Sequence, residues 1–315
     1  MSLSGIVWLA SYPKSGNTWL RVFLANYLSS ASEPVQINDL GTGQIASSRE
    51  LFDGFTGVEA SELSEEEIER LRPRVYEQLA ALLRADGDFQ LHKVHDAFSP
   101  AADRPTMFSA GTRTLYVIRN PLDVAVSFAH FMVRSLDGTI RMMARERATL
   151  AGKTDGLPRQ LRQTLRSWSS HVRSWVDESD VPVKVLRYED MKARPFEAFG
   201  RALRFLDMEP DPDKVRQAVR FSSFEELKNQ ERAHGFREGG PSGLFFRRGE
   251  VGSWKEELSA EQVQRIVADH RETMIRFGYL TEAGRLPKSG GRLPDGLATV
   301  SLSERENIVA GSALE

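Results

Sequence analysis

Apolar residues along this chain follow two alternating patterns. Short apolar runs rich in β-branched and aromatic residues are typical of buried strands, whereas apolar residues at every third or fourth position predict amphipathic helices. The predicted strands are residues 6–11, 89–95, 114–118 and 183–188. The predicted helices are residues 17–28, 64–82, 121–132, 161–176, 195–206 and 259–277. This alternation predicts an α/β fold: a single domain with a central, mainly parallel β-sheet flanked by helices, and ligands at the carboxyl ends of the strands.

The first strand runs through a short loop into the first helix. The loop carries Lys14, Ser15, Gly16 and Thr18. Because backbone N–H groups and the positive end of the helix dipole meet at such a loop, it suits a phosphate group and is typical of a P-loop-type domain. The common nucleotide-triphosphatase loop places its Lys after the second Gly, whereas here Lys14 precedes Gly16. The alternative interpretation is a plain strand–turn–helix with a solvated lysine.

The predicted strand at 114–118 also leads into a helix. Asn120 is expected to be the N-cap of that helix, Pro121 its first residue and Asp123 the partner in a capping box. Arg119 ends the strand, and its planar guanidinium suits phosphate oxygens. Taken alone, a simple ion pair between Arg119 and Asp123 is the stronger interpretation.

Other segments have weaker patterns. Residues 29–60 are expected to be irregular, either a lid over a site or a surface excursion, and 135–160 lose periodicity. Pro73 is expected to bend or divide its helix. The Gly- and Arg-rich stretch 235–252 predicts a loop. The domain is therefore expected to cover residues 1–280, and residues 281–315, rich in Gly, Ser, Pro and charge, to form a mobile C-terminal tail.

Composition limits the partners of the protein. The 315 residues carry a formal net charge of −2, so no global positive field attracts nucleic acid or an anionic membrane, and any anion site must be local. The absence of cysteine excludes disulfides, thiolate catalysis and Cys-based zinc sites. No apolar run approaches the roughly 18 residues of a membrane span. We therefore expect a cytoplasmic protein with no nucleic-acid or membrane partner.

Three separated motifs together resemble the sulfotransferases that use 3′-phosphoadenosine 5′-phosphosulfate (PAPS). Tyr12–Trp19 is similar to the family's 5′-phosphosulfate loop. Leu115–Ser127 is similar to its 3′-phosphate segment, where an Arg ends a strand and a Ser follows eight residues later. Arg247–Lys255 resembles the family's Arg-Lys-Gly-x-x-Gly-x-Trp-Lys signature, with Arg248 in place of the usual Lys. The resemblance spans roughly residues 5–280 and implies a PAPS-dependent sulfotransferase of the cytosolic type.

The resemblance also implies which residues bind PAPS and its product adenosine 3′,5′-bisphosphate (PAP). The 5′-phosphosulfate is assigned to Lys14, Ser15, Gly16, Asn17, Thr18 and Trp19. The 3′-phosphate is assigned to Arg119, Ser127, Arg247, Arg248 and Gly249. The adenine is assigned to Trp19, Tyr188, Ser222, Ser223 and Phe224. Since aromatic residues are usually core, Tyr188 and Phe224 depend most on the resemblance.

His95 is the expected catalytic base. The segment Lys93–His95 resembles the family's Lys-Thr-His at a strand end, and a neutral imidazole can accept the acceptor's hydroxyl proton. His92 is a rival, but alternation along a strand places it on the opposite face. We expect in-line sulfuryl transfer without a metal, in which Lys14 and Lys93 stabilise the charge on the leaving group.

The acceptor is less well defined. A small-molecule or natural-product hydroxyl or amine is expected, with an apolar pocket formed by Phe52, Phe55, Phe128, Phe131 and Met132. Alternatively, the Arg-rich region 134–159 admits an acidic or glycan-like acceptor. The family's dimer segment matches Lys255–Gln264 with three replacements, which leaves a monomer or a weak homodimer.

Two other functions are open on the sequence alone. One is a P-loop kinase or other phosphotransferase, which the order of Lys14 and Gly16 disfavours. The other is a non-catalytic nucleotide-binding protein on the same fold, which His95 disfavours. Magnesium dependence distinguishes the first of these from a sulfotransferase, and turnover distinguishes the second.

Overall fold

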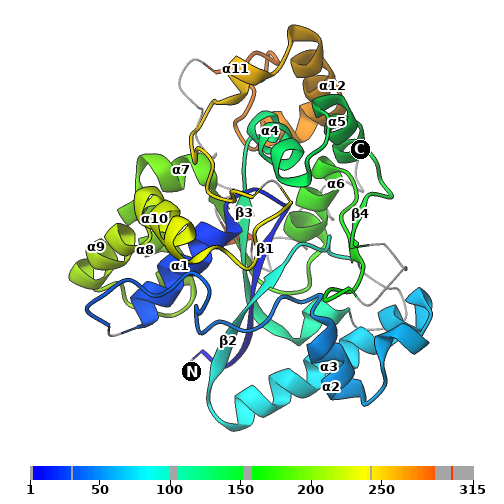
Figure 1. Ribbon diagram of the computed structural model, residues 1–315, viewed down its shortest axis with the longest axis vertical. Helices are drawn as coiled ribbons and strands as arrows, with labels where there is room; N and C mark the ends of the chain where they lie inside the picture. The colour runs from blue at the N-terminus through cyan, green and yellow to red at the C-terminus, as the bar shows by residue number, and fades with distance from the viewer. Residues whose placement is uncertain are drawn as a thin grey trace, which may run out of the picture.

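A sheet with four parallel strands forms the centre of the protein (Figure 1). The computed structural model describes residues 3–29, 31–99, 106–151, 158–241, 243–287 and 299–300. The strand order is β2 (Phe89–Val94), β1 (Gly5–Ser11), β3 (Gly111–Ile118), β6 (Val183–Arg187) and β7 (Thr299–Val300). The first four run parallel, while the two-residue β7 pairs antiparallel with β6. This confirms the predicted α/β fold.

Helices cover both faces of the sheet (Figure 1). One side carries α1 (Asn17–Leu28), α7 (Tyr188–Ala193), α8 (Pro195–Phe205), α9 (Pro212–Phe221) and α10 (Phe224–His234). The other side carries α3 (Glu65–Ala85), α4 (Pro121–Met132), α5 (Leu136–Met143), α6 (Trp168–Arg173) and α12 (Ala260–Arg276). A short helix, α11 (Trp254–Glu257), precedes α12, and a small hairpin pairs β4 (Thr149–Leu150) with β5 (Gln163–Thr164).

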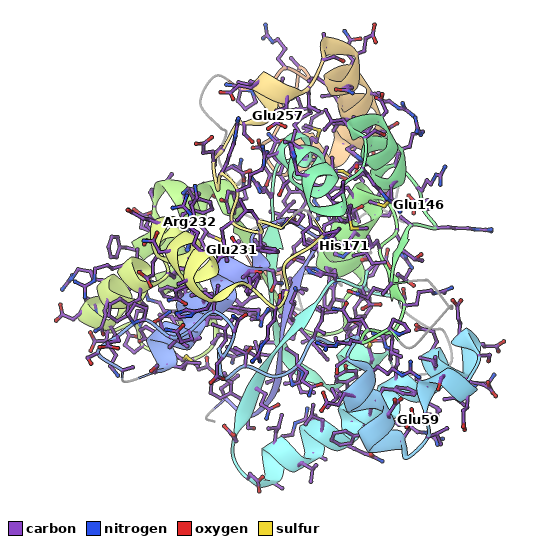
Figure 2. The ribbon with its side chains drawn as sticks, in the orientation of Figure 1. Glu59, Glu146, His171, Glu231, Arg232 and Glu257 are labelled. Carbon is purple, nitrogen blue, oxygen red and sulfur yellow. The ribbon has the colours of Figure 1, made fainter. Side chains whose placement is uncertain are left out.

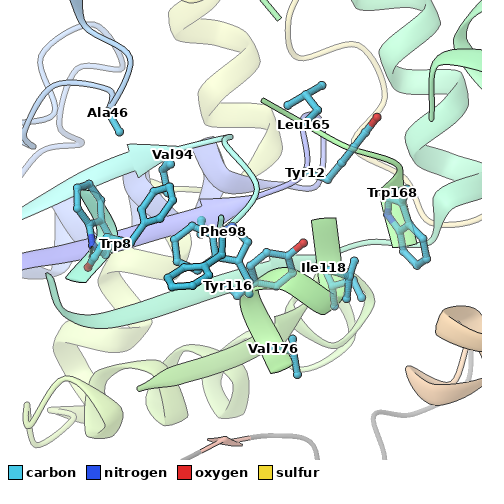
Figure 3. Close-up of a cluster of buried hydrophobic side chains, with 14 of the residues drawn as sticks. Trp8, Tyr12, Ala46, Val94, Phe98, Tyr116, Ile118, Leu165, Trp168 and Val176 are labelled. Carbon is cyan, nitrogen blue, oxygen red and sulfur yellow. Dashed lines mark hydrogen bonds between the residues drawn. The ribbon is translucent and has the colours of Figure 1, made fainter. Parts of the chain in front are cut away.

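Successive residues of β1 enter two different hydrophobic clusters. Val7 and Leu9 pack with α1, α8 and α9, whereas Ile6 and Trp8 pack with residues of α3, α4, α6 and α12. Figure 3 shows Trp8 in the second cluster. Because every residue of β1 is buried, the strand is an unbroken apolar run rather than an alternating one, as expected when helices cover both faces of a parallel sheet.

The elements differ from the sequence predictions in several places. The supposedly irregular 29–60 contains α2 (Arg49–Thr56), and 135–160 contains α5 and β4. The prediction that Pro73 divides its helix is wrong, since α3 is one helix of 21 residues whose Ser64 capping box is present. The helix predicted from residue 161 begins only at Trp168. Most of the predicted tail lies outside the described residues.

Candidate active site

A cavity of about 980 Å³ opens at the carboxyl ends of the parallel strands. It lies among the loops that follow β1, β2, β3 and β6, together with the Gly- and Arg-rich segment 236–250. The predicted site residues that line it are Lys14, Gly16, Asn17, Thr18, Trp19, Lys93, His95, Arg119, Ser127, Tyr188, Phe224, Arg247, Arg248 and Gly249. Ser15, Ser222 and Ser223 do not line it. The fold thus brings together residues from six separate stretches of the sequence: 14–19, 93–95, 119–127, 188, 224 and 247–249.

The loop between β1 and α1 has a backbone suited to binding an anion. Gly16 has a φ of 107° and lies so close to Tyr188 that a Cβ atom would come within 2.6 Å of that ring. Lys14 also has a positive φ, 66°. The Asn17 side-chain amide donates to the Leu9 carbonyl at 2.7 Å and thereby fixes the loop to β1. The Ser15 hydroxyl is buried and has no hydrogen-bond partner within the described residues, but Ser15 does not line the cavity, so a ligand would reach it only after the loop moves.

The Lys14 ammonium lies between two aromatic rings. Its Nζ is 3.5 Å from the ring centroid of Phe245 and 4.3 Å from that of Phe131, which are cation–π contacts. Burial, together with the nearby cations Lys93 and Arg119, lowers the pKa of Lys14 to about 7. An anion bound beside Lys14 would stabilise its charged form.

Lys93 and Arg21 hold one carboxylate between them. Glu238 accepts from Lys93 Nζ at 2.7 Å and from Arg21 Nη1 at 2.6 Å. Burial lowers the pKa of Lys93 and would raise that of Glu238, but the two cations keep the pKa of Glu238 well below its usual range. The sequence analysis missed Arg21 and Glu238. The available signals were a charge within the apolar helix 17–28 and an acid within a basic, Gly-rich loop.

His95 is oriented by the backbone of β1. Its Nδ1 lies 2.8 Å from the Ser11 carbonyl oxygen, and because a carbonyl only accepts, we assign the proton to Nδ1. The lone pair is then on Nε2. Burial lowers the pKa of His95 well below its usual value, and the nearby Lys93 contributes, so the ring is neutral at pH 7. His92 does not line the cavity and lies 3.1 Å from the Gln90 side-chain oxygen.

Arg119 connects two loops rather than pairing with Asp123. It donates to the Lys14 carbonyl at 3.2 Å and to the Glu250 carbonyl at 2.9 Å, while its guanidinium lies 4.3 Å from the centroid of Tyr188. The Nε of Arg119 is buried without a partner among the described residues. The ion-pair interpretation of Arg119 is therefore wrong.

Asp123 has a different role from the predicted one. Asn120 caps α4 and Pro121 is its first residue, as expected. The carboxylate of Asp123, however, accepts from the backbone N–H groups of Gly252 and Trp254 at 2.8 and 3.1 Å, and from the Ser253 hydroxyl at 3.2 Å. Asp123 thus anchors the far end of the Arg-rich loop to α4 instead of completing a capping box.

We expect Asp123→Ala to lower the free energy of unfolding by about 1–3 kcal/mol or more, because it leaves buried N–H groups unpaired. Asp123→Asn retains one accepting oxygen and should lose less. Urea denaturation would measure both losses. Glu272→Ala is the matched control, since the Glu272 side chain is 92% exposed and surface changes are usually within about 0.5 kcal/mol. A loss for Asp123→Ala no greater than this control would refute the anchoring role.

The middle of the Arg-rich loop is fixed to α11 and α10. Arg247 and Arg248 pair with Glu257 and Glu256 of α11 at 2.9 and 2.7 Å. The preceding residues, Phe245 and Phe246, donate their N–H groups to Glu231 of α10. Figure 2 labels Glu231 and Glu257. The loop is therefore held in place over the cavity.

The adenine candidates lie at the junction of the loop with α9 and α10. Tyr188 donates to the Gly249 carbonyl at 3.0 Å. Gly249 has a φ of 64°, and a Cβ there would come within 2.3 Å of the Phe224 ring. The Ser222 hydroxyl donates to the Ala218 carbonyl, and Ser223 caps α10 by accepting from the Glu226 N–H. The two serines thus shape the turn that carries Phe224.

The described residues contain neither a cluster that could hold a metal ion nor a membrane-spanning helix. No group of three or more His, Asp or Glu side chains in this part of the chain is arranged to hold a metal ion. Within the same residues, no helix is both long and apolar enough to cross a membrane.

Known proteins resemble this chain in sequence and in structure. Residues 5–278 match the sulfotransferase domain. A rabbit amine sulfotransferase is 30% identical over 52% of this chain and 55% of its own length. Rat sulfotransferase 2A6 is 25% identical over 85% of this chain and 84% of its own.

Solved structures show the same fold. Mouse sulfotransferase SULT7A1 complexed with PAP has a TM-score of 0.55 at 18% identity, and the match covers 89% of this chain and 87% of that one. Retinol dehydratase in complex with androsterone and inactive cofactor PAP has a TM-score of 0.54 at 20% identity, with coverage of 85% and 80%. Since the domain match covers most of the sequence and the structure carries the expected sheet and cavity, the chain belongs to the sulfotransferase family.

Proposed function

We propose that this sulfotransferase moves the sulfuryl group of PAPS to a hydroxyl or amine of a small-molecule acceptor by in-line transfer, with His95 as the base. The observation that carries the proposal is the convergence of Lys14, Lys93, His95 and Arg119 on one cavity. The family match and the PAP named in the two structural relatives support PAPS as the donor. This reaction is favoured over phosphotransfer and over a purely binding function.

The residues present fit an adenosine bisphosphate. The 5′-phosphosulfate is assigned to residues 14–19, where Lys14, the loop N–H groups and the positive end of the α1 dipole favour an anion. The 3′-phosphate is assigned to Arg119, Ser127 and residues 247–249, where the Arg119 Nε is a buried donor without a partner among the described residues. The adenine ring of PAP is assigned to the space between Trp19, Tyr188 and Phe224, with the Ser222–Ser223 turn behind Phe224.

The transfer step needs one base and a stabilised leaving group. Nε2 of His95 accepts the acceptor's hydroxyl proton as that oxygen forms a bond to sulfur. The bond between sulfur and the bridging phosphate oxygen breaks, and the electron pair remains on PAP. Lys14 and Lys93 stabilise the negative charge that develops on this oxygen. Both lysines must first exchange their present contacts with Phe245 and Glu238 for the donor.

PAP is expected to stabilise the protein against thermal unfolding regardless of magnesium, whereas ADP and ATP are not. A ligand at 100 times its dissociation constant contributes roughly 2.7 kcal/mol, which gives a visible melting shift. Each nucleotide would be measured by differential scanning fluorimetry with and without magnesium. A shift seen only with ATP and magnesium would identify a phosphotransferase and refute the proposal.

Three further properties belong to the proposal. The absence of cysteine fits a cytoplasmic protein. For the oligomeric state we propose a monomer or weak homodimer, because the segment Lys255–Gln264 departs from the family's dimer motif at three positions and its Ser259 caps α12. We also propose residues 1–280 as the sulfotransferase domain and 281–315 as a C-terminal tail, of which Thr299 and Val300 pair with β6.

A further inference from the structure

The half of the cavity away from the donor loop is not the aromatic pocket that the sequence suggested. Phe52 and Phe128 are buried in the main hydrophobic cluster, and Phe55 and Met132 pack against that cluster. None of these four lines the cavity. Phe131 does, but its ring is in contact with the Lys14 ammonium. The expected pocket is therefore not formed, and the phenylalanines that line the cavity are Phe131, Phe224, Phe236, Phe245 and Phe246.

Two chain segments, 37–53 and 158–163, form the wall that lies there instead. Backbone hydrogen bonds join them: the Arg49 N–H donates to the Arg159 carbonyl at 3.1 Å, and the Leu161 N–H donates to the Ser47 carbonyl at 2.7 Å. A β-bridge between Ser48 and Gln160 adds to this connection. Side chains from the two segments are thus presented to the cavity on one fixed surface.

Two polar atoms on this wall are buried without a partner among the described residues. One is the Gln163 side-chain oxygen, an acceptor, on a residue that is 2% exposed. The other is Arg49 Nη2, a donor. Both side chains are already oriented, since the Gln163 amide donates to the Gln160 side-chain oxygen at 2.8 Å and Arg49 Nε donates to Asp53 at 3.3 Å. Because an unpaired buried polar group is costly, an oriented donor and acceptor at a cavity indicate a ligand that satisfies both.

The charges on the wall have no dominant sign. Arg49 and Arg159 are accompanied by Asp39, Glu50 and Asp53, and Asp53 is already paired with Arg49. The other arginines of the region 134–159, which suggested an acidic or glycan-like acceptor, do not line the cavity where it is described. The wall therefore fits a neutral polar molecule better than an anion.

Resting on the proposed function, we propose that the acceptor is a neutral polyhydroxylated molecule, a sugar or glycoside, whose non-reacting hydroxyls hydrogen-bond to Gln163 and Arg49. A hydroxyl donates and accepts at once, so adjacent hydroxyls match the unpaired amide oxygen of Gln163 and the unpaired guanidinium N–H of Arg49. A phenol or simple alcohol has only the reacting hydroxyl and would leave both wall groups unpaired, which selects strongly against it.

The test compares pairs of acceptors that carry the same apolar group but differ in whether they contain a sugar, with PAPS as donor. Octyl β-D-glucoside is paired with octanol, and phenyl β-D-glucoside with phenol. We expect kcat/KM to be at least about tenfold higher for each glucoside. Equal or better turnover of octanol and phenol would overturn the proposal, and so would an absence of glucoside sulfation while PAP still stabilises the protein. If PAP does not stabilise it, the proposed function itself is refuted and this inference falls with it.

Variants test the two wall residues directly. Gln163→Leu is expected to raise KM for the glucoside about tenfold or more, with the melting shift by PAP retained. Arg49→Met should raise the KM for the glucoside similarly. A melting curve checks that this variant stays folded without the ion pair between Arg49 and Asp53. Gln264→Leu is the matched control, because Gln264 is exposed on α12 and does not line the cavity. An unchanged KM in folded Gln163→Leu would remove Gln163 from the acceptor site.

Discussion

Replacing His95 with alanine is expected to slow turnover by roughly 10²- to 10⁴-fold while leaving PAP affinity close to that of the unaltered protein. The Ser11 carbonyl fixes the proton on Nδ1 and leaves the Nε2 lone pair as a base at the cavity. Alanine removes that base but none of the groups assigned to the donor. The rate constant for a single turnover and the dissociation constant for PAP, from calorimetry, would separate the two effects.

The control for this experiment is His234→Ala. His234 is an exposed residue at the end of α10 and does not line the cavity, so its replacement should change neither quantity. An unchanged turnover in His95→Ala would remove His95 from the role of base. A loss of PAP affinity equal to the loss of rate would instead make His95 a donor-binding residue.

The lowered pKa of His95 sets the expected pH profile. A base is lost when it becomes protonated, which happens as the pH falls through its pKa in the folded protein. Burial and Lys93 place that pKa well below the usual value. His95 therefore stays neutral as the pH falls from 7.5 to 6, and its titration causes no loss of turnover in that window.

The central sheet was predictable because each strand has a strong local signal. A strand that is buried on both faces is apolar along most of its length, and such apolar runs in the sequence predicted β1 and β3. The position of the site then followed from topology, since parallel strands bring their carboxyl ends to one edge of the sheet. Short elements such as α2 and α5, with eight residues each, span barely two turns and give too little periodicity to detect.

Long-range pairings within the site could not be predicted from the sequence. Glu238 meets Lys93 across 145 positions and Arg21 across 217, and Asp123 meets Trp254 across 131. Local rules assign Asp123 to its own helix, because nothing near it in the chain shows that the Gly252–Trp254 backbone folds over it. The wall formed by segments 37–53 and 158–163 was not predicted for the same reason, since these segments lie more than 100 positions apart in the sequence.

The segment 236–245 contacts both lysines that we propose for the transfer step. Glu238 neutralises Lys93, and Phe245 covers the Lys14 ammonium. The same segment is hydrogen-bonded to the wall formed by 37–53 and 158–163, because the Arg237 N–H donates to the Asn38 side-chain oxygen at 2.8 Å. Donor and acceptor ends of the cavity thus share one loop, and donor binding must rearrange contacts that this loop makes.

Lys14→Ala is expected to weaken PAP binding by about 10- to 150-fold, because it removes a charge-assisted hydrogen bond worth about 1.5–3 kcal/mol. The pKa of about 7 adds a pH dependence. Above that pH the free protein holds Lys14 uncharged, so binding of the anion must take up a proton. PAP affinity should then fall by up to about tenfold per pH unit above 7.

Calorimetry in two buffers of different ionisation enthalpy at pH 8 would detect the proton taken up on PAP binding. In Lys14→Ala the uptake and the fall in affinity above pH 7 should both disappear. Lys214→Ala, at an exposed position on α9, is the matched control and should keep both. If the uptake persists without Lys14, another group carries it. If Lys14→Ala binds PAP as tightly as the unaltered protein, the assignment of this loop to the 5′-phosphate is wrong, and the cation–π contacts with Phe131 and Phe245 are then the structural role of Lys14.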